Sequence, residues 1–259
     1  MKQLIILEDI KVKYNNKTIF ENISWIIEEN TFITLCGKNG IGKSTLIKTI
    51  LEKVPYDGVI KKENLDINKI AYLSENPNVS IVGDTVIEEL RTVLKKQKYT
   101  EEEIKDKIKR IIAEFKLEKI ENKLTTHLSG GEKQLVSFVK TILKNSKILI
   151  LDNCFSMIDK IKKEKLIKYI KKYKQENKIT IIHITNDTND ILYSDIMAIL
   201  TEKELISGKI EDILKKESDF KENKLELPFM VDLSNKLKYY DLMDKPIYEL
   251  DKMVNHLWK

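Results

Sequence analysis

Hydrophobic residues between Leu4 and Cys36 alternate with polar ones, as they do on a strand with one buried face. Many of the apolar residues are β-branched or aromatic, which also favours strands. Asn15-Asn16 and Asp57-Gly58 are predicted turns because their side chains suit turn geometry. Strands are predicted over residues 4–14, 18–27, 31–36, 59–60 and 70–73.

From about residue 79 to 145 the apolar positions recur at spacings of three and four, which predicts helices. Beyond that segment, apolar runs at Ile148 to Leu151 and Ile179 to Ile184 flank a Lys-rich helical pattern, Lys160 to Lys178. A strand, a helix and a second strand in this order predict a βαβ unit in the core of a parallel sheet.

The pattern changes again after Ser207-Gly208. Lys215 to Asn223 holds few large apolar residues and is predicted to be a linker. Pro228 then opens a helical pattern, and a final helix carries apolar residues at Leu250, Met253, Val254, Leu257 and Trp258. We therefore expect an α/β unit over residues 1–215, with a helical subdomain over about 78–145, and a C-terminal helical tail over 216–259.

Composition excludes some classes of protein. The 259 residues are 42% hydrophobic and 34% charged, which excludes a disordered chain. No apolar run approaches the roughly 18 residues of a membrane span, and Met1 to Leu7 lacks the apolar core of a signal peptide. We expect a cytoplasmic protein in which Cys36 and Cys154 are buried thiols rather than a disulfide.

The formal charge of +5 does not predict a nucleic-acid partner. Only Arg91 and Arg110 are arginines, and lysine lacks the bidentate fork that favours base and phosphate recognition. The lysines also alternate with acidic residues along helical segments, which is typical of solvated helix faces. A weak attraction to an anionic membrane surface remains open.

A glycine-rich segment joins the strand at Thr31 to Cys36 to an apolar helix pattern that begins near Thr45. It satisfies G-x-x-x-x-G-K-[ST], as Gly37-Lys38-Asn39-Gly40-Ile41-Gly42-Lys43-Ser44. Backbone amides of such a loop cradle phosphate oxygens, Lys43 bridges the β- and γ-phosphates, and the Ser44 hydroxyl binds Mg²⁺. The sequence therefore predicts binding of a nucleotide with Mg²⁺ at residues 37–45.

A second motif narrows the class. Leu128-Ser129-Gly130-Gly131-Glu132-Lys133-Gln134 precedes an apolar helix and then the strand Lys147 to Asp152. This resembles the ATP-binding-cassette (ABC) ATPases, in which an LSGGQ signature precedes a Walker B strand that ends in Asp. The resemblance covers about the first 210 residues. It implies an α/β P-loop NTPase fold with an antiparallel β subdomain, a helical insertion and a small C-terminal helical domain.

The resemblance also implies roles for individual residues. Ser129, Gly130, Gly131 and Glu132 would reach the γ-phosphate held by a second ATPase subunit, so that two chains share two sites. Asp152 would orient Mg²⁺ through water, and Ser156 to Asp159 fits the D-loop that crosses the dimer. Tyr14 stands where the family stacks an aromatic ring on adenine, although an exposed aromatic at a strand end explains it equally well.

Within the family, Glu75 to Val86 resembles the Q-loop of energy-coupling-factor and cobalt-type importers, and Leu227 to Leu233 resembles their dimerising helical tail. That likeness implies uptake of a vitamin or a transition metal. It also implies three partners: a second ABC ATPase, identical or different, an integral membrane scaffold and a substrate-binding membrane component. The chain would then lie peripherally at the cytoplasmic face of the membrane.

Three positions depart from the pattern of an efficient ATPase. Asn153 stands where a glutamate polarises the attacking water, Asn186 replaces the switch histidine, and Glu75 replaces the Q-loop glutamine. Loss of a general base typically lowers the rate by ~10²–10⁴. We therefore expect the site to bind MgATP and to hydrolyse it slowly; a one-residue shift, with Ser74 in the place of Glu75, is the simpler alternative for that position.

Two other functions fit parts of the sequence. An ATP-gated clamp with a non-transport partner would also bind ATP and barely hydrolyse it. An exporter or DNA-repair cassette is disfavoured, since repair members carry long coiled-coil insertions and the insertion here is short.

Overall fold

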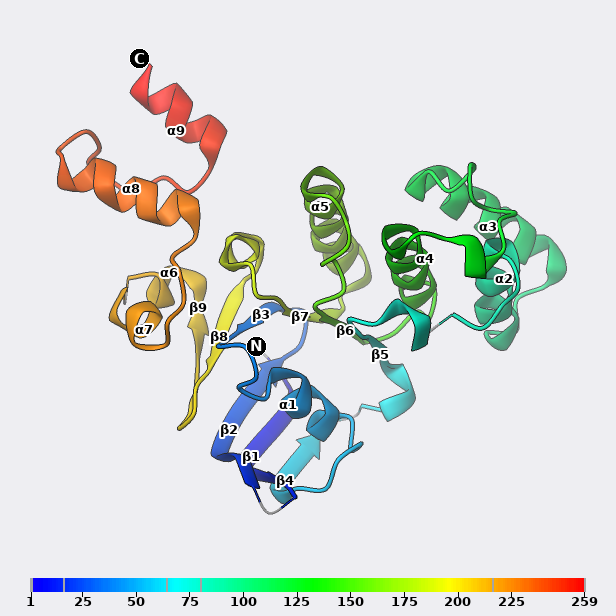
Figure 1. The fold of residues 1–259 in the computed structure, drawn as a ribbon, viewed down its shortest axis with the longest axis horizontal. Coiled ribbons are helices and arrows are strands. Elements are labelled where there is room, and N and C mark those ends of the chain that lie inside the picture. The colour runs from blue at the N-terminus through cyan, green and yellow to red at the C-terminus, as the bar shows by residue number, and fades with distance from the viewer. Residues whose placement is uncertain (1, 16, 64, 80, 216, 259) are drawn as a thin grey trace. The chain divides into compact units, whose positions relative to one another are not determined.

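The computed structural model describes residues 2–15, 17–63, 65–79, 81–215 and 217–258 (Figure 1). Asn16 of the predicted turn, Ser80 of the Q-loop segment and Lys216 at the start of the predicted tail lie outside the described residues. The chain divides into two compact units. The first unit consists of Met1–Glu63 together with Ile184–Lys259, and the second unit is Asn64–His183.

The first unit contains a three-stranded antiparallel sheet. β1 (Gln3–Tyr14) lies between β2 (Lys17–Glu28) and β4 (Asp57–Lys62), and both pairs are antiparallel. Large apolar side chains of β2, such as Phe20 and Ile23, are buried while their neighbours are exposed. The predicted strands and the antiparallel β subdomain are confirmed, and the short strand at Val59 to Ile60 is longer than predicted.

The first unit also contains buried strands that lead to the phosphate loop. β3 (Phe32–Cys36) is buried at every residue and pairs in parallel with β8 (Ile196–Leu200), which pairs antiparallel with β9 (Leu205–Lys209). α1 (Lys43–Ile50) follows β3, and η4 (Thr188–Tyr193) precedes β8. Neither β8 nor β9 is predicted from the alternation pattern, because β8 is apolar throughout and β9 contains Gly208, where a turn is expected.

The tail packs onto these strands through side chains whose burial the sequence pattern does not predict. After α6 (Ile210–Ile213) come α7 (Glu217–Glu222), α8 (Phe229–Tyr239) and α9 (Leu250–Leu257). Phe220 of α7 is fully buried in a cluster with Cys36, Met197 and Ile199. The linker prediction for Lys215 to Asn223 is therefore wrong, since one aromatic side chain anchors the segment.

Both cysteines are buried thiols, as predicted. Burial raises the pKa of Cys36 to about 12, so that this thiol stays protonated at neutral pH.

The second unit contains the strands that carry the remaining motif residues. β5 (Ile70–Leu73), β6 (Ile148–Asp152) and β7 (Thr180–Ile184) are neighbours in that order, and β5 pairs with β6 in parallel. α5 (Lys160–Asn177) connects β6 to β7, which confirms the predicted strand–helix–strand order. Short 3₁₀ turns are η1 (Ile67–Lys69), η2 (Pro77–Val79) and η3 (Thr125–His127).

Three helices in the second unit begin with the same local device. They are α2 (Val86–Lys96), α3 (Glu101–Phe115) and α4 (Gly130–Ile142), which lie together in Figure 1. Each starts with a capping box, in which a Thr or Ser and a Glu three residues later bond each other's backbone amides. The predicted helical segment is confirmed. Within the described residues, no helix is long and apolar enough to cross a membrane.

A buried ion pair joins α2 to α4. Lys140 of α4 bonds Glu89 of α2, whose side chain also accepts hydrogen bonds from the amides of Val82 and Gly83. Burial alone would raise the pKa of Glu89, but the bonds to Lys140, Gly83 and Val82 outweigh it and hold this pKa below its usual value. The Glu89 carboxylate thus attaches the segment that precedes α2 to helix α4.

We expect Phe220→Ala to destabilise the first unit by about 3–5 kcal/mol, because it leaves a cavity beneath α7. The exposed Phe229 provides a matched control, and Phe229→Ala should change thermal stability little at the same protein concentration. Equal melting temperatures for the two variants would contradict the packing of α7.

We expect Glu89→Gln to lower the free energy of unfolding by about 3 kcal/mol at pH 7, because Lys140 keeps its charge without its partner. Because the folded pKa of Glu89 is lowered, its contribution is present above the unfolded pKa and is lost as pH falls below it. Urea unfolding from pH 7 to pH 3 should therefore show a shallower loss of stability in the variant. Parallel pH curves would contradict this assignment.

Candidate functional site

The phosphate loop folds back on its own lysine. Lys43 is the first residue of α1 and is buried, and its Nζ donates to the carbonyl oxygens of Gly37 at 2.7 Å and of Lys38 at 3.1 Å. A positive charge is thereby held against the loop at the N-terminus of a helix, where the helix dipole also favours an anion.

Two glycines make this loop possible. Gly37 has φ +152°, and a Cβ there would lie 2.6 Å from the carbonyl oxygen of Leu200. Gly42 has φ +107°, and its Cβ would lie 2.9 Å from Ile19. Because Gly42 is also the N-cap, no side chain caps the first amides of α1, and its first turn contains no acidic residue. Such an end suits a phosphate group.

The other loop residues differ in their exposure to solvent. Lys38, Asn39 and Gly40 are exposed, while Ile41 is half-buried and its amide bonds the Lys38 carbonyl at 3.2 Å. Ser44 and Thr45 lie half-buried in the first turn of α1.

Asn186 belongs to the same unit and lies close to the strand that leads into the loop. The amide of Thr185 donates to the Leu35 carbonyl on β3 at 3.5 Å. The Thr185 hydroxyl donates to Asp190 at 2.7 Å and accepts from the Asp187 amide at 3.0 Å. Asn186 is therefore an exposed residue on an anchored turn.

Tyr14 ends β1 and is 70% exposed. This exposure agrees with both readings of the residue, as an adenine platform and as a strand-end aromatic.

In the second unit, Asp152 ends β6 and is only 3% exposed. The Tyr72 hydroxyl on β5 donates to Asp152 Oδ2 at 2.9 Å. Asn153 follows with φ +46°, a left-handed conformation that asparagine tolerates better than most residues. Sequence reasoning missed Tyr72; its only signal is a tyrosine in an otherwise aliphatic strand.

Glu75 is exposed and opens the loop after β5. Bonds to α4 fasten this loop: Lys133 Nζ donates to Asn78 Oδ1 at 3.1 Å, and the Ser137 hydroxyl donates to the Pro77 carbonyl at 3.5 Å. The Q-loop segment and the signature helix are therefore joined by side chains.

The signature begins α4. Ser129 is the N-cap, its amide donates to Glu132 at 2.8 Å, and Lys123 pairs with Glu132 at 3.1 Å. The Ser129 amide and then Lys123 lower the pKa of Glu132, which keeps this side chain charged. Since glutamine would close the same capping box, the Glu132 departure leaves the local fold intact.

The D-loop packs on the signature. A Cβ on Gly130 would lie 2.7 Å from Met157 Sδ, and one on Gly131 would lie 2.9 Å from the Met157 carbonyl. Gln134 donates to Ser156 at 3.2 Å and accepts from the Met157 amide at 2.9 Å. These contacts were not predicted, and the close approach to a backbone carbonyl explains why position 131 is glycine.

The predicted site residues thus fall into two groups. The first unit holds Tyr14, the phosphate loop and Asn186. The second unit holds Glu75, Asp152, Asn153 and the signature residues 129–132.

Mg²⁺ prefers one or two carboxylates together with waters and phosphate oxygens, and the oxygen donors in each unit are of these kinds. In the second unit, Asp152 offers a buried carboxylate held by a phenol and Glu75 an exposed carboxylate. In the first unit, Ser44 offers a hydroxyl beside the phosphate loop.

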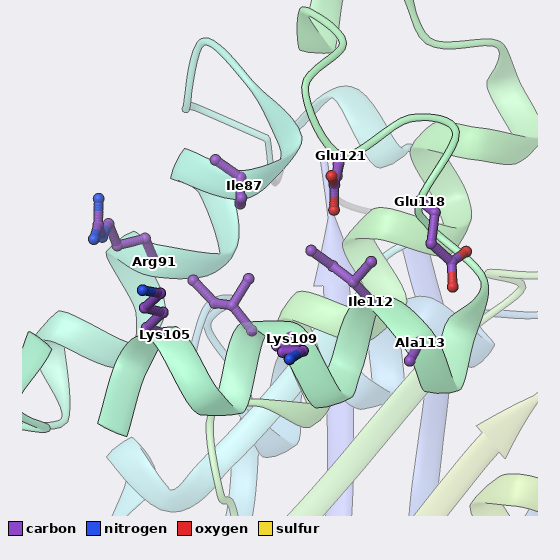
Figure 2. A pocket seen from close by; sticks show the side chains of 9 residues that line it. Ile87, Arg91, Lys105, Lys109, Ile112, Ala113, Glu118 and Glu121 are labelled. Carbon is purple, nitrogen blue, oxygen red and sulfur yellow. The ribbon is translucent and has the colours of Figure 1, made fainter. Parts of the chain in front are cut away.

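A pocket of about 520 Å³ lies elsewhere, against α2 and α3 (Figure 2). Its walls combine apolar side chains with charged ones; the lining residues are Ile87, Arg91, Lys105, Ile108, Lys109, Ile112, Ala113, Glu118 and Glu121. None of the predicted site residues lines it.

Known proteins resemble this chain over most of its length. The ABC transporter family matches residues 20–156. The energy-coupling factor transporter ATP-binding protein EcfA1 of Fusobacterium nucleatum is 32% identical over 213 residues, which cover 78% of this chain and 80% of that relative. The corresponding EcfA of Enterococcus faecium is 29% identical over 274 residues, which cover 100% of this chain and 98% of that relative.

Solved structures confirm the fold. The structure of cbiO1 from Clostridium perfringens, described as part of the ABC transporter complex cbiONQ, matches with a TM-score of 0.73 at 22% identity. The match covers 90% of this chain and 99% of cbiO1. The chain therefore belongs to the ABC transporter family and is similar to the ATP-binding proteins of energy-coupling factor transporters.

Proposed function

We propose that this chain is the ATP-binding subunit that energises a membrane importer of the energy-coupling factor type, serving uptake of a vitamin or a transition-metal ion. The observation that carries the proposal is the phosphate loop, in which Lys43 is held against the backbone at an uncapped helix start. The relatives named as energy-coupling factor ATP-binding proteins supply the transport context.

Each part of the site has a role in binding MgATP. Residues 37–45 hold the phosphates, with Lys43 bridging the β- and γ-phosphates. Ser44, Asp152 and Glu75 provide the oxygen donors that would hold Mg²⁺, which supplies charge neutralisation at the phosphates when bound. Tyr14 contributes an exposed ring for the adenine.

The chain's own site hydrolyses ATP slowly in this proposal. An amide at Asn153 can hold a water but cannot take its proton, so the general base is missing. Asn186 can still donate a hydrogen bond to the γ-phosphate, and Glu75 adds negative charge where phosphate charge develops. The groups that bind are retained while those that activate water are changed.

The partners follow from the same reading. A second ABC ATPase, identical or different, would pair its phosphate loop with Ser129 to Glu132 of this chain, and helices 216–259 would support that dimer. The exposed apolar residues Leu250 and Val254 of α9, and Trp258 at its C-cap, support this role of the tail. A membrane scaffold and a substrate-binding membrane component complete the importer, with this chain at the cytoplasmic face of the membrane and no nucleic-acid partner.

With a different partner, the two sites of the dimer would be unequal. The site on this chain's phosphate loop would hold ATP, and the site completed by this chain's signature would turn it over. Co-purification from the native host tests the assembly, because recovery of a membrane scaffold supports an importer. Recovery of an ATPase dimer with only a non-transport partner would favour an ATP-gated clamp instead.

We expect Lys43→Ala to weaken ATP binding by about 10–100-fold, the cost of roughly 1.5–3 kcal/mol for a lost bond to a charged group. Lys48→Ala, on an exposed position of the same helix, is the control and should bind ATP as the wild type does. Calorimetric titration measures both. Equal affinity of Lys43→Ala and the wild type would contradict a nucleotide site at this loop.

We expect the isolated chain to bind MgATP with little hydrolysis and Asn153→Glu to raise its turnover on the order of 10²-fold, because a general base is restored. Asn153→Gln is the matched control: it places a side chain of equal length at the same left-handed position without adding a base. Phosphate release measures the rates. Robust turnover by the wild type would overturn the slow-site proposal.

A further inference from the structure

A tyrosine outside the sequence motifs contacts the carboxylate that ends β6. Tyr72 pairs in the parallel register with Ile150, two residues before Asp152. Residues two apart on a strand share a face, and an aromatic side chain reaches its diagonal neighbour on the next strand. The Tyr72 hydroxyl accordingly donates to Asp152 Oδ2 at 2.9 Å.

We propose that Tyr72 is a positioning residue for the Mg²⁺ that accompanies ATP, because its phenol fixes the Asp152 carboxylate in the orientation that accepts metal-bound water. The inference rests on the proposed function, since it requires MgATP at this chain's own site.

The geometry gives the phenol control over this carboxylate. Asp152 is only 3% exposed, so bulk water contributes little to its orientation. A hydrogen bond from a hydroxyl to a carboxylate is roughly twice as strong as a neutral one. A carboxylate has about four acceptor positions, so that the bond to Tyr72 and bonds to metal-bound water use different ones.

Loss of the hydroxyl distinguishes a positioning role of Tyr72 from a packing role of its ring. A ring that only fills space would be replaced by phenylalanine without consequence for metal binding. If the hydroxyl orients a metal-binding carboxylate, its removal should weaken metal binding, because removing such outer partners typically lowers metal affinity by about 10–100-fold.

The test uses the full chain with Tyr72→Phe. Mn²⁺ serves as the probe for the Mg²⁺ site and is titrated at an ATP concentration below that of the chain, so that little free nucleotide chelates the metal, while electron paramagnetic resonance measures bound metal. Affinity for ATP alone is measured by calorimetry in EDTA. We expect Mn²⁺ affinity to fall about tenfold or more, and ATP affinity in EDTA to stay unchanged.

Tyr173→Phe is the matched control. It removes a phenol that donates to the Ile142 carbonyl at 3.4 Å, away from Asp152, and should change neither affinity. If Tyr72→Phe does not fold, Tyr72→Met keeps an apolar side chain without the hydroxyl and carries the same expectation.

Wild-type Mn²⁺ affinity in the variant would overturn the inference, and so would an equal loss of Mn²⁺ and metal-free ATP affinity, which marks general damage. Failure of the wild-type chain itself to bind ATP would instead overturn the proposed function.

Discussion

A chain that leaves a buried strand must satisfy its polar groups within a few residues, and the motif residues of this protein lie at such exits. β3 leads into the loop whose carbonyls accept from Lys43. β6 ends at Asp152, which accepts from Tyr72. After β7, the turn that carries Asn186 is held by the Thr185 hydroxyl. The same bonds that make these exits stable hold Lys43 and Asp152, which we propose bind phosphate and metal, in fixed positions.

Two departures from the family pattern, at Glu132 and Asn153, fit the local structure. Glu132 closes the same capping box that glutamine would close, and its carboxylate is neutralised by Lys123. Asn153 has a left-handed backbone conformation, which asparagine adopts more readily than glutamate does. Because these substitutions fit their surroundings, the local fold does not require the catalytic residues of the family. Reduced hydrolysis is therefore compatible with a well-formed binding site.

The sequence predicted the parts of the fold that have a strong period or a fixed motif. Alternation marks β1 and β2, and the glycine spacing marks the loop at Gly37. The sequence could not reveal the burial of Phe220, because one aromatic residue in a polar run shows no hydrophobic periodicity. Tyr72 was missed for another reason: its contact depends on the register of β5 against β6, and register is a property of two segments far apart in the chain.

The side-chain bonds of α4 suggest how the second unit acts as one body. This helix begins at the signature, contacts the Q-loop segment through Lys133, and binds the D-loop through Gln134. Lys140 adds the buried bond to Glu89, which also holds the amides of Val82 and Gly83. A displacement of the segment after Glu75 would break these bonds unless α4 moved with it. Since breaking a buried ion pair is costly, concerted movement of the Q-loop segment and the signature is the favoured response.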